Sequence, residues 1–284
     1  MSLTHITARW LLALGGASLA MPAAVAAEAA YRFSPVNQWD IARTAAYWNP
    51  IVQYVSDKSG VKIELKIGRT SADTTSYVLT QEVEFVFSNH LFSPEREALG
   101  WKVFGRRNSP ALRGQIAVPE DSPVRRVEDL QGKTVAFAGP EAFVGYKVPS
   151  AYLMSKGIQF RTDFGGNQNA AFAQMFAGKA QATGSNSMLI EGYANREGKR
   201  FRVLWTSEGY HDLALMASGK VPEKDVRAVA QAFLGMHLDP AGREILHKAS
   251  QAVGLGADAY FIPAANEDYA SYRRFFQTAP TALR

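Results

Sequence analysis

The chain has 284 residues, a formal net charge of +5 and no cysteine. The lack of cysteine excludes disulfides, thiolate metal sites and cysteine nucleophiles. The mild positive charge is compatible with anionic ligands, whereas nucleic-acid binding is not expected, because the basic residues form isolated pairs rather than a dense stripe.

The N-terminus has the order of a secretory signal peptide. Arg9 precedes an apolar run over residues 10–20, Met21-Pro22 ends that run, and small residues follow. The run is too short for a permanent transmembrane helix, and a chain without cysteine carries no thiol-linked lipid. We therefore expect residues 1–27 to be removed and a soluble periplasmic protein to remain; the alternative is an ordinary buried N-terminal helix.

The first part of the remaining chain alternates strands with helices. Tyr47, Ile51 and Val55 recur at helical spacing, and Gly60 is a stop signal. Apolar runs and alternation between apolar and polar residues indicate the strands. The expected order is a strand over 31–35, a helix ending at Gly60, a strand over 61–67, a helix over 72–80 and a strand over 85–87 that leads into Ser88-Asn89-His90.

The second part continues this alternation. The expected strands cover residues 115–118, 134–138, 181–184, 202–205 and 213–218. One helix is expected after Gly139-Pro140. Five more are expected over residues 169–177, 187–195, 222–237, 241–249 and 267–276. Strands that alternate with helices predict α/β layers, and the length suits two lobes rather than one core.

The stretch from Gly114 to Gly157 is the most informative part of the sequence. It contains a strand, a turn at Asp121-Ser122-Pro123, the run Glu128-Asp129-Leu130-Gln131-Gly132-Lys133, a second strand and a loop with glycine before a helix. A strand followed by such a loop and a helix N-terminus is a common anion-binding geometry. This order resembles the PhnD-like phosphate, phosphite and phosphonate-binding proteins of ABC importers.

The resemblance implies an α/β, two-lobed type II periplasmic binding protein, with a central sheet flanked by helices in each lobe and the ligand in the cleft between them. Lobe 1 would comprise residues 28–110 and 213–284, and lobe 2 residues 111–212, with crossovers near 108–117 and 205–216. Such a protein is a monomer and not an enzyme, has no cofactor or metal, and passes a small solute to a membrane permease. A sensory protein that partners a membrane histidine kinase is the alternative.

The sequence departs from the family at the ligand loop. Family members usually carry a Ser-Thr-Ser-Gly loop where this chain has Ala142-Phe143-Val144-Gly145. The family's Gly-Ser-His run appears as Gly166-Asn167-Gln168, and an acidic residue of the family is replaced by Gln181. Amides and an aromatic ring thus stand in place of hydroxyls and charges. A small anionic or zwitterionic solute with an apolar or planar part therefore fits these residues better than a simple phosphonate does.

Several residues are candidates for ligand contact because they sit at predicted strand ends or helix starts. Each has a plain alternative, since aromatic residues are often core and an amide at a helix start is often a cap. Phe143 in particular is either a ligand contact or part of the core of its lobe. The candidates are Trp39, Tyr47, Asn89, His90, Phe143, Tyr146, Lys147, Asn167, Gln168, Asn186, Tyr210 and His211.

Motifs of catalysis are absent from the sequence. There is no G-x-S-x-G, no phosphate-binding P-loop and no H-E-x-x-H. His211 and Asp212 are adjacent, but no motif places a serine as nucleophile beside them. The five histidines are scattered singly and do not indicate a metal site. An exported hydrolase remains only a third alternative.

Overall fold

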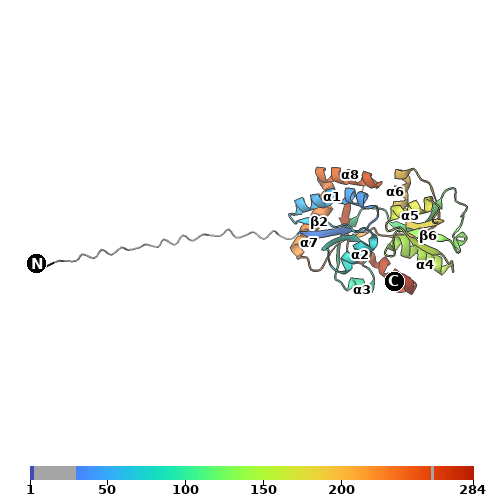
Figure 1. The fold of residues 1–284 in the computed structure, drawn as a ribbon, viewed down its shortest axis with the longest axis horizontal. Coiled ribbons are helices and arrows are strands. Elements are labelled where there is room, and N and C mark those ends of the chain that lie inside the picture. The colour runs from blue at the N-terminus through green and yellow to red at the C-terminus, as the bar shows by residue number, and fades with distance from the viewer. Residues whose placement is uncertain (3–29, 257–258) are drawn as a thin grey trace.

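The computed structural model describes residues 1–2, 30–256 and 259–284. In these residues the chain forms two β-sheets, each flanked by helices, which lie side by side along the long axis of the molecule (Figure 1). We call the first sheet with its helices lobe 1 and the second sheet with its helices lobe 2. The predicted α/β class is confirmed, while the predicted signal peptide falls almost entirely outside the described residues.

Lobe 1 contains a six-stranded sheet in the order β11-β4-β10-β3-β1-β2. Strand β1 pairs in parallel with β2 and β3, whereas β10 runs antiparallel between β3 and β4. The strands are β1 (Tyr31–Pro35), β2 (Ile63–Leu65), β3 (Phe85–Ser88), β4 (Lys102–Arg107), β10 (Ala214–Ala217) and β11 (Phe261–Pro263). The helices are α1 (Ile41–Ser59), α2 (Ser71–Leu79), α3 (Pro94–Glu97), α7 (Glu223–Gly235) and α8 (Pro240–Val253).

Lobe 2 contains a five-stranded sheet in the order β7-β6-β8-β5-β9. The strands are β5 (Leu112–Pro119), β6 (Thr134–Phe137), β7 (Arg161–Phe164), β8 (Ala182–Asn186) and β9 (Phe201–Tyr210). The helices are α4 (Val148–Ser155), which follows a π-helical turn over Phe143–Lys147, α5 (Gln168–Phe176) and α6 (Ser187–Glu197).

Residues at both ends of α1, the helix that follows β1, define where it begins and ends. The Asp40 side chain accepts a hydrogen bond from the backbone N–H of Arg43 and caps α1, which therefore begins before the apolar pattern that predicted it. Gly60 ends the helix in the left-handed conformation at a φ of 69°. The buried face includes Tyr47 and Ile51, as their spacing predicted.

Aromatic rings fill the core of lobe 1 on the face of the sheet that α1 and α7 cover. Phe33 of β1 lies 4.9 Å from Trp48 of α1 and 5.8 Å from Phe233 of α7, measured between ring centroids. Lobe 2 has a smaller core in which Val135 and Phe137 of β6 are fully buried. The larger apolar cluster is not confined to lobe 1, because it continues into lobe 2 through residues that include Phe143 and Leu189.

Two short connections join the lobes. The chain leaves lobe 1 between Arg107 and Leu112 and returns between Tyr210 and Ala214. Because β5 begins at Leu112 and β9 extends to Tyr210, both connections are shorter than the predicted crossovers. Arg107 and Asp212, which are both fully buried, form an ion pair with an N···O distance of 3.5 Å between the two connections.

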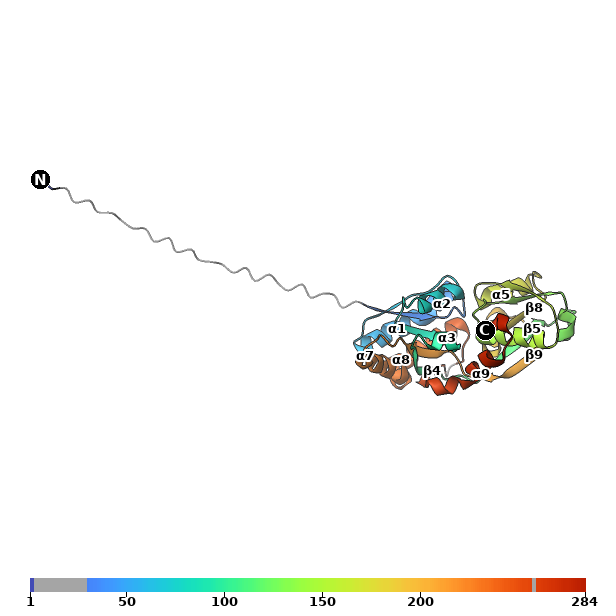
Figure 2. The same ribbon diagram turned by 90° about the horizontal axis from the view of Figure 1, so that it is seen from below.

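The last helix, α9 (Ala270–Thr278), lies beneath both lobes and brings the C-terminus beside lobe 2 (Figure 2). Tyr272 of α9 packs against Phe143 of lobe 2 at a centroid distance of 4.2 Å. The Nζ atom of Lys147 donates to the backbone carbonyl of Leu283 at 3.1 Å. The end of the chain, which the sequence assigned to lobe 1, thus packs against lobe 2.

The sequence analysis did not predict three of the strands. β4 contains Gly105 and the Arg106-Arg107 pair, which interrupt an apolar pattern. β7 is largely exposed and β11 has only three residues. These strands lie at or near sheet edges, where backbone pairing with a neighbouring strand stabilises a segment that lacks a strand-like sequence.

Candidate functional site

A small cavity lies between the lobes where the carboxyl ends of four strands meet. Residues that follow β1 and β3 line it from lobe 1, and residues that end or follow β6 and β8 line it from lobe 2. The volume is about 40 Å³. The lining residues are Val36, Asn37, Gln38, Ser71, Asn89, His90, Ala138, Ala142, Phe143, Val144, Gly145, Gln168, Asn186, Leu189 and Leu213. None of them carries a formal charge at neutral pH, and five are amides.

A larger hollow of about 410 Å³ lies elsewhere, along the segment Arg107–Leu112 and helix α6. Its lining includes no residue from the end of β3 or from the loop after β6. The smaller cavity does include these residues, and in α/β proteins ligands bind outside the carboxyl ends of strands. The smaller cavity is therefore the candidate site.

Three helices begin at this cavity. Ser71 is the first residue of α2, Gln168 is the first residue of α5, and Asn186 caps α6 by accepting from the backbone N–H of Leu189. The first N–H groups of a helix have no partner inside the helix, and the helix dipole makes this end partly positive. The helices therefore give a positive potential to a cavity whose lining has no cationic side chain, although the N–H of Ser71 itself already donates to the carbonyl of Gly166.

His90 is buried at the end of β3, with 3% of its surface exposed. Its Nδ1 atom lies 2.8 Å from Oγ1 of Thr75, and its Nε2 atom has no hydrogen-bond partner among the described residues. Burial lowers the pKa of His90 to about 4 against a raising effect of Glu141, so the ring is neutral near pH 7.

Gln38 connects the cavity to the buried ion pair. Its Oε1 atom accepts a hydrogen bond of 3.3 Å from the guanidinium of Arg107, and its Nε2 atom is buried without a partner in the part of the chain that the structure describes. Arg107 in turn contacts Asp212 and lies over the rings of Tyr47 and Phe87. The carboxamide of Gln38 is therefore oriented by a charged group and retains N–H donors that the protein leaves unpaired.

Phe143 lines the cavity from the altered loop but also packs into an aromatic cluster. Its ring lies 5.3 Å from Tyr210, 4.9 Å from Phe275 and 5.5 Å from Phe276, in addition to the packing against Tyr272. Only 1% of the side chain is exposed. Both interpretations of Phe143 from the sequence thus find support in its position.

The structure brings five of the twelve candidate residues together around the cavity, and their roles toward a ligand stay predictions. Asn89, His90 and Phe143 line it, and so do the two residues that were also expected as helix caps or starts, Gln168 and Asn186. Asn89 lies within 3.5 Å of the Tyr272 hydroxyl through its Nδ2 atom. The predicted meeting of the β3 end with the loop after β6 is therefore observed.

The other seven candidates do not line this cavity, and each has an evident structural role. Trp39 and Tyr47 pack in the core near Arg107, and Tyr146 packs against Phe137 and Phe164. Lys147 donates to the Leu283 carbonyl, and Asn167 caps α5. Tyr210 packs on Phe143, and the carbonyl of His211 accepts from the Tyr272 hydroxyl.

The sequence prediction missed Gln38 and Ser71. Gln38 directly precedes the candidate Trp39. Since β1 ends at Pro35, the amides Asn37 and Gln38 are closer to the strand end, and this position was the available signal. Ser71 was missed because the helix was expected to begin one residue later.

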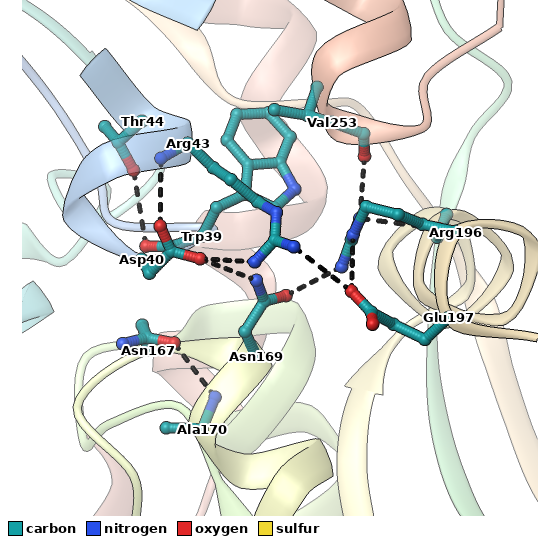
Figure 3. Close-up of polar contacts among 11 residues, drawn as sticks. Trp39, Asp40, Arg43, Thr44, Asn167, Asn169, Ala170, Arg196, Glu197 and Val253 are labelled. Atoms are coloured by element: carbon teal, nitrogen blue, oxygen red, sulfur yellow. Dashed lines mark hydrogen bonds and ion pairs between the residues drawn. The ribbon is translucent and has the colours of Figure 1, made fainter. Parts of the chain in front are cut away.

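Polar contacts join the lobes on one side of the cavity (Figure 3). Arg43 of α1 forms an ion pair with Glu197 of α6 at 3.2 Å. Asn169 of α5 lies between Asp40 and Arg196: it donates to the Asp40 carboxylate and accepts from the Arg196 guanidinium, both at 3.2 Å. These contacts join α1 of lobe 1 to α5 and α6 of lobe 2.

A second ion pair joins the lobes at Arg96 and Glu141. Arg96 donates to the Glu141 carboxylate at 2.6 Å and to the backbone carbonyl of His90 at 2.8 Å. Burial acts to raise the pKa of Glu141, but the hydrogen bond from Arg96 and nearby positive charges outweigh it and lower the pKa. The pair is mostly buried, so it contributes more than an exposed surface pair would.

Comparison with known proteins places the chain in a family. A family model described as the periplasmic substrate-binding protein of a phosphonate ABC transporter matches residues 33–269. The chain belongs to this family. Proteins of this family bind solutes for import and are not enzymes.

Solved structures of similar fold agree with this assignment. A binding-protein component of an ABC phosphonate transporter from Pseudomonas aeruginosa has a TM-score of 0.75 at 13% identity, covering 87% of this chain and 86% of that chain. PhnD1 from Prochlorococcus marinus, in complex with methylphosphonate, has a TM-score of 0.73 at 13% identity, covering 87% and 97%. A Xanthomonas citri protein bound to ATP has a TM-score of 0.66 at 14% identity, covering 90% and 97%. At these identities the comparison shows the fold, which is the predicted two-lobed type II fold.

One curated enzyme shares a short segment with the chain. An ATP phosphoribosyltransferase from Thermodesulfovibrio yellowstonii is 53% identical over 49 residues, which cover 17% of this chain and 15% of the enzyme. Because so small a part of either protein is shared, the match does not indicate that this protein has the enzyme's activity. Among the described residues there is also no group of acidic, histidine or cysteine side chains that would hold a metal ion, and none of their helices is long and apolar enough to cross a membrane.

Proposed function

We propose that this protein captures a small anionic or zwitterionic solute in the cavity between its lobes and presents it to the permease of an ABC importer. The observation that carries this proposal is the convergence of three helix N-termini on a cavity with unpartnered buried polar atoms, Nε2 of Gln38 and Nε2 of His90. Buried polar atoms without partners are costly, and a bound solute would pair them.

The lining favours a solute with a small apolar part beside its polar group. Phe143, Leu189 and Leu213 contribute apolar walls, while Gln38 and Asn89 contribute amides. The loop at Ala142–Gly145 has no side-chain hydroxyl. Simple phosphonates and orthophosphate would therefore bind less tightly than in family members that carry hydroxyls in this loop, because each lost hydrogen bond to a charged group costs about 1.5–3 kcal/mol.

Closure would take place about the two connections between the lobes. The proposed lobes comprise residues 28–110 with 213–284 and residues 111–212. The C-terminal helix contacts both, since Tyr272 packs against Phe143 of lobe 2 and against Phe92 of lobe 1. Residues 1–27 would serve as the signal for export to the periplasm, and the protein would act as a monomer. The family assignment favours transport over the sensory alternative.

A thermal-shift screen tests the proposal with phosphonates, phosphate, sulfonates, carboxylates and small zwitterions. The best solute is then titrated calorimetrically into the wild type, Gln38→Ala and Gln53→Ala. Gln53 is an exposed residue of α1 and serves as the control. We expect Gln38→Ala to weaken binding about tenfold and Gln53→Ala to leave it unchanged. Equal affinity in all three proteins would refute the assigned site.

A further inference from the structure

The orientation of the Gln38 carboxamide follows from its neighbour Arg107. A guanidinium carries only N–H donors, so it can bond to the oxygen of a carboxamide but not to its NH2 group. Arg107 donates to Oε1 of Gln38 at 3.3 Å, and both side chains are buried. The NH2 group therefore lies on the side away from Arg107, where its Nε2 atom has no partner among the described residues. Gln38 thus has only donors left for the cavity that it lines.

Groups from several parts of the molecule surround the Arg107 guanidinium. Asp212, in the return connection, forms the ion pair with it at 3.5 Å, and the sulfur of Met188 in α6 lies 3.8 Å from Nη1. The ring centroids of Phe87 and Tyr47 lie 4.9 and 5.2 Å from its Cζ atom. A carboxylate and two aromatic faces both attract a cation. The guanidinium is therefore held in one place although it is fully buried.

Asp212 is in turn bonded to both connections between the lobes. Its Oδ2 atom accepts from the hydroxyl of Ser109 in the outgoing connection at 3.2 Å. Its Oδ1 atom accepts from the backbone N–H of Leu213 in the return connection at 2.7 Å. Contacts thus run from both connections through Asp212 and Arg107 to Gln38. The carboxamide at the cavity is therefore tied to the two segments that join the lobes.

We propose that Arg107 and Asp212 are positioning residues for the solute site: the buried pair holds the carboxamide of Gln38 so that both Nε2 hydrogens are left for the solute. Neither residue of the pair lines the cavity, so their effect on binding would pass through Gln38. The plain alternative is that the pair only stabilises the connections between the lobes. The inference rests on the proposed solute-binding function and adds to it two residues outside the cavity.

Side-chain ¹⁵N relaxation of Gln38 tests the positioning without any solute, and Gln38→Ala identifies the signal. The wild type is compared with Arg107→Met/Asp212→Asn, which removes both charges together so that neither is left buried and unpaired. We expect the order parameter of the Gln38 NH2 group to exceed about 0.8 in the wild type and to fall below about 0.6 in the double variant. Circular dichroism and thermal melting check that the variant folds.

A double-mutant cycle tests the consequence for binding, with methylphosphonate as the probe in calorimetric titrations. We expect Gln38→Ala to weaken binding about tenfold in the wild-type background and less than about threefold in Arg107→Met/Asp212→Asn. The control background is Arg273→Met/Glu97→Gln, which removes an ion pair between α9 and α3. There we expect the tenfold effect of Gln38→Ala to persist. A pair that only stabilised the fold would leave this effect the same in all three backgrounds.

The outcomes separate the inference from the proposed function. An order parameter that stays high in the double variant, or a tenfold effect of Gln38→Ala in that background, overturns the inference and leaves the solute-binding function standing. An order parameter below about 0.6 in the wild type overturns it whether or not the double variant folds. Absence of binding by methylphosphonate and by the whole solute screen overturns the proposed function, while the relaxation measurement still decides whether the buried pair positions Gln38.

Discussion

Gly139 of lobe 2 and Ser71 of lobe 1 approach so closely that a Cβ atom placed on Gly139 would lie 2.4 Å from Oγ of Ser71. Apart from the chain neighbours of Gly139, no other described residue has an atom within 4 Å of that position. Ser71 is buried at the start of α2, and its backbone N–H donates across the lobes to the carbonyl of Gly166 at 3.2 Å. An alanine at this position would therefore have to displace the Ser71 hydroxyl at the interface between the lobes.

The first prediction is that Gly139→Ala holds the lobes apart while each lobe stays folded. We expect solute affinity to fall about tenfold, since closure no longer brings both halves of the site together. Ser71→Ala combined with Gly139→Ala should restore closure, because the Cβ atom of Ser71 is 3.8 Å away. Gly235→Ala, which meets no atom within 4 Å, is the control. X-ray scattering and calorimetry give the readouts, and normal closure in Gly139→Ala would be incompatible with this interpretation.

The second prediction compares the two ion pairs between the lobes. Glu141→Gln should shift the lobes toward an open arrangement by about 1–2 kcal/mol, because the pair with Arg96 is mostly buried. Glu197→Gln should shift them by less than about 1 kcal/mol, because its pair with Arg43 is more exposed. Single-molecule fluorescence on labelled lobes measures both populations. Equal effects would show that burial does not distinguish the two pairs.

The third prediction concerns stability at low pH. Burial lowers the pKa of His90 to about 4 from an ordinary value of 6.5, so the unfolded state binds a proton in this interval and the folded state does not. Stability should therefore decrease as the pH falls from 6.5 toward 4, by about 1.4 kcal/mol per unit from this group. Urea unfolding at pH 7, 6 and 5 measures the slope. His90→Gln should have a shallower slope than the wild type, and an unchanged slope would mean that His90 does not govern it.

The fourth prediction concerns Phe143. Because its ring packs among four aromatic rings, Phe143→Ala should destabilise the protein by about 3–5 kcal/mol and loosen the contact with α9. Phe164→Ala should have a small effect, since this side chain is exposed by 41%. Thermal unfolding of both variants is the measurement. A stable Phe143→Ala variant with weakened binding would instead identify Phe143 chiefly as a ligand contact.

The sequence predicted those parts of the site that local signals specify. Asn89 and His90 follow a buried apolar run, so their place at the end of a strand could be inferred. Asn167 and Asn186 are typical helix caps, and both cap helices in the structure. The alternation of strands and helices predicted the α/β class for the same reason, because each element carries its own periodicity.

The remainder depends on contacts between distant segments. The roles of Gln38 and Arg107 arise from a hydrogen bond between residues 69 positions apart, which no local pattern encodes. Trp39 and Tyr47 have strong apolar signals, but those signals are equally consistent with a core position, and the core is where they lie. The packing of α9 against lobe 2 likewise depends on tertiary contacts with Phe143.

The central claim, that a solute binds between the lobes and closes them, is tested most directly by the distance between the lobes during a titration. The chain has no cysteine, so Glu64→Cys and Lys156→Cys allow fluorescent labels at one exposed site in each lobe. We expect the best acid from the screen to shorten the distance in the wild-type background and to leave it nearly unchanged with Gly139→Ala. Binding detected by calorimetry with no change in distance in the wild-type background would contradict the account.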